Sequence, residues 1–138
     1  MEIYYSNNKL YKNNIFLRVS ETKNKPKISL KNVPKNKIYS LVMFDPDAVG
    51  GNKIHWLITN IINENILCGN EIINYKGPAP PKGSGTHRYV FCLFEQKKIV
   101  SNQNVLFDSR FVELKILFKK IVPSMKFIDV IYFISENL

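Results

Sequence analysis

The chain has 138 residues, of which 45% are hydrophobic and 12% aromatic, so it is long enough to bury one core and too apolar to be disordered throughout. No apolar run reaches the length of a membrane span, and the N-terminus lacks the basic start and apolar stretch of a secretory signal. We therefore expect a single domain over residues 1–138 that acts in the cytoplasm.

The formal net charge is +9, which in general attracts nucleic acid, an anionic membrane surface or an acidic protein. The chain holds 17 lysines but only three arginines, and it is equally rich in asparagine and isoleucine. An AT-rich genome produces this bias, so the charge alone does not indicate a nucleic-acid partner. No aromatic stacking motif is interleaved with arginine, and we expect no nucleic-acid binding.

Three apolar runs in the middle of the chain predict β-strands. They cover residues 38–44, 55–62 and 87–94, and the first ends at the turn signal Asp45-Pro46-Asp47. Because each run is apolar on both faces, we expect three central strands of one sheet, the first antiparallel to the other two. The preceding segment, residues 22–37, is rich in Lys, Asn and Pro and predicts loops around a short strand.

Residues 75–86 separate the second and third runs and consist mainly of proline, glycine and lysine. Proline removes backbone donors and fixes φ, so this segment is predicted to be an ordered loop without regular structure. The two cysteines, Cys68 and Cys92, form no C-x-x-C pair and are predicted to be free thiols.

Near the C-terminus the apolar spacing becomes helical. The positions at this spacing are Phe111, Leu114, Leu117, Phe118 and Ile121. Asp108 or Ser109 is a candidate N-cap, and Pro123 is predicted to end the helix. A last strand over residues 127–134 completes a mainly β sandwich with one late helix.

Asp45, His55 and His87 are the residues that suggest chemistry, because each stands at the end or start of an apolar strand. In the predicted sheet they meet at one edge, where ligand sites commonly form. An aspartate and two imidazoles suit metal binding, acid–base chemistry, or binding of a phosphate or carboxylate through N–H groups. An alternative of equal weight is that each histidine only caps a strand and contacts the backbone.

Two of these chemistries lack local support. Metal binding lacks an H-x-H, H-x-x-E-H or Cys–His cluster, so we expect no metal or cofactor. Nucleophilic catalysis lacks a clear nucleophile, because a G-x-S-x-G pattern centred on Ser84 would need glycine at Lys82 and Thr86. We predict a binding protein rather than an enzyme, with a small hydrolase or metal-dependent enzyme as the catalytic alternative.

Two longer motifs resemble the phosphatidylethanolamine-binding protein (PEBP) family, which includes animal kinase inhibitors and plant flowering regulators. The first is Asp45-Pro46-Asp47-Ala48 followed by a strand that begins His55-Trp56-Leu57, and the second is the run GPAPPKGSGTHRYVF at residues 77–91. The resemblance implies a large central antiparallel sheet, a smaller second sheet, one C-terminal helix and a small pocket for a phosphate or phosphoethanolamine-type headgroup.

Carried over position by position, the resemblance assigns four ligand-binding residues, Asp45, His55, His87 and Tyr89. It assigns six pocket-shaping residues, Pro46, Asp47, Trp56, Ala79, Pro80 and Pro81. It also implies that Arg88 pairs with a carboxylate such as Asp47. The chain departs from the family pattern at Val49, which stands for a proline, and in the short connection over residues 48–54, which lacks the Tyr and Trp that often wall the pocket.

The function implied is a non-catalytic regulatory protein that binds phosphate, a phospholipid headgroup or a phosphorylated residue, with a signalling protein or an anionic membrane as further partner. The alternative is a modulator of kinase signalling whose pocket is vestigial. We expect both imidazoles to donate N–H bonds to the anion, and binding to strengthen as the pH falls through the histidine range near about 6.5.

Overall fold

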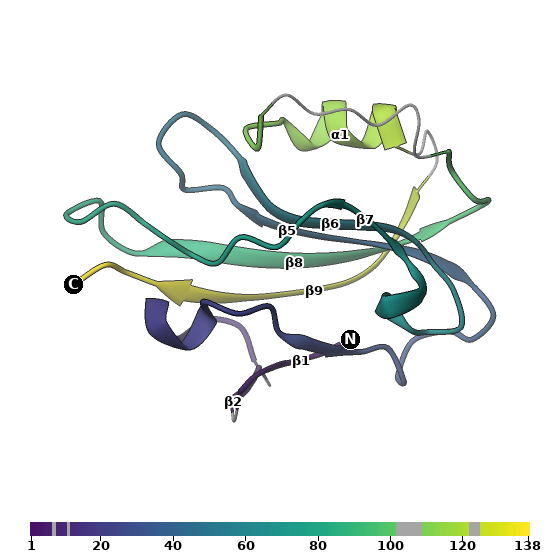
Figure 1. The fold of residues 1–138 in the computed structure, drawn as a ribbon, viewed down its shortest axis with the longest axis horizontal. Coiled ribbons are helices and arrows are strands. Elements are labelled where there is room, and N and C mark those ends of the chain that lie inside the picture. The colour runs from purple at the N-terminus through teal and green to yellow at the C-terminus, as the bar shows by residue number, and fades with distance from the viewer. Residues whose placement is uncertain (7, 11, 102–108, 122–124) are drawn as a thin grey trace.

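A computed structural model describes residues 1–6, 8–10, 12–101, 109–121 and 125–138, which are arranged in three layers (Figure 1). A large β-sheet lies in the middle, with the helix α1 (Leu114–Ile121) on one face and a small sheet on the other. The small sheet consists of β1 (Glu2–Tyr5), β2 (Asn8–Leu10) and β4 (Lys27–Ser29), in the order β2-β1-β4.

The large sheet has the strand order β3-β9-β8-β5-β6-β7 in the described part of the chain. Its strands are β3 (Ile15–Phe16), β5 (Ile38–Asp45), β6 (Lys53–Ile61), β7 (Asn70–Ile73), β8 (His87–Gln96) and β9 (Met125–Ser135). The predicted single sheet is confirmed, because β5 runs antiparallel to both β6 and β8. The sheet is not wholly antiparallel, since the short edge strand β3 pairs parallel with β9.

The apolar residues of β5 are buried on both faces of the sheet, as the sequence predicted. Leu41 and Met43 belong to a core between the two sheets, whereas Val42 and Phe44 belong to a second core with Leu117 of α1. Each such side chain contributes roughly 1.5–3 kcal/mol when it is fully removed from water. The two cores hold β5 at the centre of the molecule, and the site described below lies at the end of this strand.

The helix begins later than the sequence predicted. Phe111 lies outside it and forms an isolated β-bridge with Lys53. The cause is pairing with the start of β6, because the Ile54 N–H donates to the carbonyl of Arg110 at 2.6 Å and holds this segment extended. Ser109 is therefore no N-cap, and its hydroxyl accepts from the Phe111 N–H at 3.1 Å instead. Asp108 and Pro123 lie outside the described residues.

Residues 74–86 contain neither helix nor strand, in agreement with their proline and glycine content. The loop is attached to the sheet where the Lys76 N–H donates to the carbonyl of His55 at 2.8 Å. Gly77 is required there, because a Cβ atom would lie 2.8 Å from the carbonyl oxygen of Thr22. Thr22 belongs to the short helix η1 (Val19–Thr22), and a second short helix, η2 (Ile66–Cys68), precedes β7.

No helix in the described residues is long and apolar enough to span a membrane.

The two cysteines are free and differ in their surroundings, which predicts different reactivity. Cys68 is exposed on η2, whereas Cys92 is half-buried on β8, and burial raises the pKa of the Cys92 thiol to about 11. Since the thiolate is the reactive form, we expect iodoacetamide at pH 8 to label Cys68 first and Cys92 only after unfolding. Peptide mass spectrometry of wild type and Cys68→Ser measures this, and equal labelling rates in native protein would contradict it.

Candidate functional site

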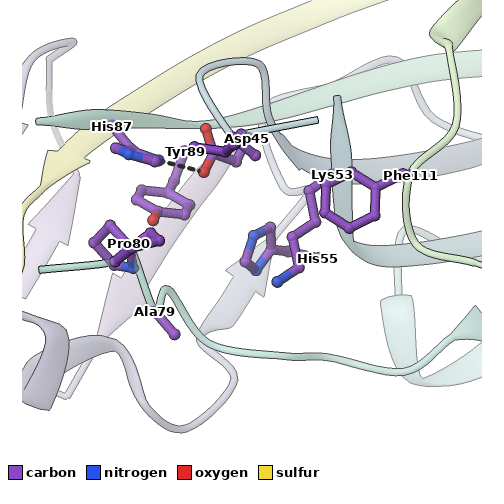
Figure 2. Close-up of a pocket in the computed structure, with 11 residues that line it drawn as sticks. Asp45, Lys53, His55, Ala79, Pro80, His87, Tyr89 and Phe111 are labelled. Atoms are coloured by element: carbon purple, nitrogen blue, oxygen red, sulfur yellow. Dashed lines mark hydrogen bonds and ion pairs between the residues drawn. The ribbon is translucent and has the colours of Figure 1, made fainter. Parts of the chain in front are cut away.

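Asp45, His55 and His87 lie at one edge of the large sheet because their strands are neighbours in the order β6-β5-β8. Together with Tyr89 they line a cavity of about 100 Å³ (Figure 2). The four residues that the resemblance assigns to ligand binding are thus brought together. The other lining residues are Ala48, Val49, Lys53, Ala79, Pro80, Pro81 and Phe111.

A β-bulge in β6 turns His55 toward this cavity. Met43 pairs with Trp56 and Phe44 pairs with Ile54, so His55 is the extra residue between them. In a regular strand His55 and Trp56 would face opposite sides of the sheet. The bulge places both on the side of the small sheet, where His55 meets the Tyr89 ring with ring centroids 5.3 Å apart and the planes at 86°.

Arg110 stabilises the bulge from the outside. Its Nη1 donates to the carbonyls of Ile54 at 3.2 Å, His55 at 3.3 Å and Asn74 at 3.0 Å. Its Nη2 donates to Oδ1 of Asn74 at 2.6 Å. The guanidinium therefore ties the bulged strand to the chain that enters the proline-rich loop. The segment Phe107-Asp108-Ser109-Arg110 weakly resembles a late F-x-x-R segment of the family. Sequence reasoning assigned Arg110 no role in the site, because nothing in a linear pattern shows which carbonyls a bulge leaves exposed.

His87 and Asp45 form a buried pair, with exposed fractions of only 2% and 3%. The imidazole Nδ1 donates to Asp45 Oδ2 at 2.8 Å, since a carboxylate accepts. The backbone N–H of Asp47 donates to the other oxygen, Oδ1, at 2.8 Å. Both carboxylate oxygens are thus held, and the orientation of the His87 ring is determined.

Asp47 and Arg88 support this pair from outside the cavity, in the pairing that the resemblance implied. Arg88 donates through Nε and Nη2 to the two carboxylate oxygens of Asp47 at 2.9 and 2.8 Å. These hydrogen bonds hold the pKa of Asp47 below its usual range. Asp47 does not line the cavity, and it acts on the site through the backbone N–H that it donates to Asp45.

Ser84 is a neighbour of the site that sequence reasoning dismissed. Its Oγ lies 2.9 Å from His87 Nε2 and 2.6 Å from the carbonyl oxygen of Pro81. The Ser84 N–H donates to the same carbonyl at 3.0 Å and closes a tight turn. This turn places the Ser84 hydroxyl beside His87. The result is a chain of contacts from Ser84 through His87 to Asp45, which the glycine spacing did not indicate.

His55 presents a hydrogen-bond acceptor to the site. Its Nδ1 lies 2.7 Å from the carbonyl oxygen of Lys76, and because a carbonyl only accepts, Nδ1 carries the proton. In the neutral ring Nε2 then has a lone pair, and it is buried without a hydrogen-bond partner among the described residues. Burial lowers the pKa of His55 to about 4. The expectation that both imidazoles donate to an anion near pH 6.5 is therefore wrong for His55.

Lys53 is the cation of the cavity, and the sequence analysis missed it. Its Nζ lies 5.8 Å from the centroid of the Phe111 ring. Burial lowers the pKa of Lys53, and the nearby charges of Lys76 and Arg110 lower it further. Among the described residues none of these three cations forms an ion pair with a carboxylate. The sequence could have indicated Lys53, because it stands two residues before His55 and side chains two positions apart on a strand tend to share a face.

Trp56 does not belong to the cavity, which corrects one predicted pocket-shaping residue. Its ring packs edge-on against Tyr75, with centroids 5.4 Å apart, and its Nε1 donates to Glu71 at 3.3 Å. It lines a separate cavity of about 390 Å³ beside Ile58 and Leu67. Pro46 is half-buried and also lies outside the lining of the site, whereas Ala79, Pro80 and Pro81 are part of it.

The lining of the cavity combines hydrogen-bond donors with one carboxylate, that of Asp45. In the described residues no three His, Cys, Asp or Glu side chains are grouped as a metal site requires. A lysine without an ion pair and a phenolic hydroxyl, that of Tyr89, offer donors to a negatively charged group.

The depressed pKa of His55 predicts a specific pH dependence of stability. Between pH 6.5 and about 4 the unfolded histidine binds a proton that the folded one does not. The free energy of unfolding therefore decreases as the pH falls through this window, by on the order of 3 kcal/mol from this group. Urea unfolding at pH 7 and 4.5 should show a smaller decrease for His55→Gln than for wild type. An NMR titration of wild type in which His55 titrates near pH 6.5 would refute this.

Comparison with known proteins agrees with the motifs. The family model described as phosphatidylethanolamine-binding protein matches residues 7–122. The chain is 37% identical over 91 residues to Protein FLOWERING LOCUS T of Arabidopsis thaliana, covering 61% of this chain and 51% of that protein. It is 34% identical over 106 residues to Protein SELF-PRUNING of Solanum lycopersicum, covering 71% of this chain and 59% of that protein. The chain thus spans little more than half the length of these relatives.

Solved structures show the same fold. A carboxypeptidase Y inhibitor, in a complex with its cognate proteinase, matches with a TM-score of 0.81 at 23% identity, over 99% of this chain and 82% of that one. A phosphatidylethanolamine-binding protein from Plasmodium vivax matches with a TM-score of 0.74 at 19% identity, over 99% and 84%. With the family model covering most of its length, the chain belongs to the phosphatidylethanolamine-binding protein family.

Proposed function

We propose that this chain is a non-catalytic binding protein whose cavity holds an anionic, phosphate-type group and thereby regulates a protein partner. The observation that carries the proposal is the cavity lining. Lys53 without an ion pair, Tyr89 and the buried histidines converge on about 100 Å³. An anionic ligand would supply acceptors to the Lys53 ammonium and the Tyr89 hydroxyl.

The size of the cavity limits its ligand. Pockets for drug-sized molecules usually measure about 300–1,000 Å³, and this cavity has a volume of about 100 Å³. It suits a phosphate, a phosphoethanolamine-type headgroup or the phosphoryl end of a modified residue, with the remainder of the ligand outside. The +9 net charge adds a general attraction for anionic ligands and surfaces.

A protein partner is supported by one relative. The carboxypeptidase Y inhibitor was solved in complex with a proteinase, so a member of this fold acts through a protein contact. The cytoplasm is the proposed compartment, and the free thiols Cys68 and Cys92 fit its reducing conditions. A signalling modulator with a vestigial pocket is the alternative, and it predicts that partner binding survives loss of anion binding.

A small hydrolase is a second candidate because Ser84, His87 and Asp45 are linked by hydrogen bonds. The serine hydroxyl has one proton, and its distance to the Pro81 carbonyl, 2.6 Å, is shorter than its 2.9 Å to His87. A proton donated to the carbonyl is not available to a general base, so we expect a fluorophosphonate probe to leave Ser84 unlabelled. Labelling that disappears in His87→Asn would establish the hydrolase instead.

Substitution of His87 tests the anion site. His87→Ala would leave the buried Asp45 carboxylate without its imidazole partner and risk unfolding. His87→Asn keeps an N–H near the position of Nδ1 and removes Nε2, which donates to an anion when the ring is the imidazolium paired with Asp45. We expect calorimetric titration with inorganic phosphate at pH 7 to show binding weakened about tenfold or more, the scale of one hydrogen bond to a charged group.

Thr86→Val is the matched control, because Thr86 is an exposed neighbour of His87 whose hydroxyl contacts Glu136 at 3.4 Å. Its affinity for phosphate should equal that of wild type. Equal affinities for wild type and His87→Asn would reject the cavity as the binding site.

A further inference from the structure

A second cavity lies between the small sheet and the large sheet, and we call it the Trp56 cavity. Its volume is about 390 Å³, within the range of about 300–1,000 Å³ that is usual for small-molecule sites. Its floor is buried and apolar, and it is formed by Pro26, Ile28, Trp56 and Ile58. The Trp56 cavity therefore offers an apolar group a place away from water.

The walls of the Trp56 cavity are fixed by packing and by hydrogen bonds. The β-bulge in β6 turns the Trp56 ring to this side, and Tyr75 holds it edge-on at 5.4 Å. The η2 segment forms the opposite wall and approaches β6 closely, since a Cβ atom on Gly69 would lie 2.5 Å from Cγ2 of Ile58. Side chains held in this way leave a preformed space, which a ligand fills at little entropic cost.

The mouth of the Trp56 cavity carries more positive than negative charge. Its exposed lining residues are Lys25, Lys27, Leu67 and Glu71. The Glu71 carboxylate already has two partners, because its Oε2 accepts from Trp56 Nε1 at 3.3 Å and lies 3.5 Å from Lys25 Nζ. Lys27 forms no ion pair with a carboxylate in the part of the chain that the structure describes. Lys27 is therefore the cation at this mouth that a ligand can meet.

The positive charge continues onto the outer face of the small sheet. Lys25 and Lys27 also line an adjoining hollow of about 560 Å³, together with Lys31 and Glu2. Glu2 is shared between Lys9 at 3.3 Å and Lys31 at 3.5 Å. Because lysines outnumber carboxylates on both sides of Lys27, a negatively charged group is favoured there and an ammonium is repelled.

We propose that the Trp56 cavity binds an amphipathic carboxylate, with its hydrocarbon body against Trp56 and Ile58 and its carboxylate on Lys27. An apolar cavity of about 150 Å³ holds the six carbons of benzene, so one of about 390 Å³ holds roughly fifteen carbons when filled. An acid of about ten carbons fits with its charged end at the mouth. This site is separate from the cavity lined by Asp45, His55 and His87, and the proposal does not depend on anion binding there.

Charge selection is the first test. Calorimetric titration of wild type at pH 7 with decanoate and with decylammonium, both below their micelle concentrations, compares one chain with two opposite charges. Decanoate should bind about tenfold or more tightly, the scale of one charge-assisted contact. Lys27→Met retains the apolar stem and should reduce this preference to less than about threefold. Lys37→Met is the matched control, because Lys37 is exposed but lines neither hollow, and it should keep the full preference.

Trp56 reports the position of the ligand. A bromine atom quenches indole fluorescence on contact, so ω-bromodecanoate should quench the emission of Trp56, whereas decanoate should bind with similar affinity and not quench. Leu67 is 82% exposed, so Leu67→Glu should leave the fold intact. Its carboxylate at the mouth should weaken decanoate binding about tenfold or more.

The outcomes separate this proposal from its alternatives. Equal affinity of wild type for decanoate and decylammonium, or a full preference in Lys27→Met, would overturn it. Binding of ω-bromodecanoate without quenching, or loss of decanoate binding in Lys53→Met, would place the acid elsewhere and overturn it too. A dimer that Leu67→Glu dissociates would show that a second copy of the chain covers the mouth instead. Failure to bind inorganic phosphate would reject the proposed function and leave this inference standing.

Discussion

The extra residue in β6 is the feature on which the geometry of the site depends. Without the bulge at His55, the imidazole would point toward the helix side of the sheet, into the core that contains Ile54 and Leu57. With the bulge, the His55 ring faces Tyr89 and the cavity. The backbone carbonyl of His55 accepts from Arg110 and from the Lys76 N–H. A bulge weakens a ladder locally, so Arg110 and the proline-rich loop compensate for the hydrogen bonding that β6 gives up there.

The polar side chains of the site are fixed by hydrogen bonds to one another and to residues outside the cavity. Asp45 has both oxygens engaged, by His87 and by the Asp47 N–H, and Asp47 is in turn held by Arg88. A site supported in this way needs little rearrangement when a ligand arrives, and preorganised donors lose less entropy on binding. Lys53 is held differently, since its backbone bridges to Phe111 and its Nζ lies 5.8 Å from the centroid of the Phe111 ring.

Much of the fold followed from local pattern. The runs at residues 38–44, 55–62 and 87–94 are strands of one sheet, because side chains apolar on both faces can be satisfied only between two layers. The helix start was misplaced because Phe111 continues the apolar spacing while its backbone pairs with β6, a long-range contact that periodicity does not encode. Trp56 was misassigned for a similar reason: adjacency to His55 in sequence did not show that its ring turns to Tyr75. Sequence reasoning did not place Ser84 and Arg110 at the site, because a turn and a bulge bring them there and a linear pattern shows neither.

Trp56 has a practical consequence for anyone studying this protein in solution. It is the one tryptophan of the chain, it is 1% exposed, and it lies at the junction of the two sheets rather than in the cavity lined by Asp45, His55 and His87. Its emission should shift strongly to the red when the sheets separate, which makes it a faithful reporter of unfolding. The same position should make it nearly silent when that cavity fills, so an intrinsic-fluorescence screen for anions that bind there would score true binders as inactive.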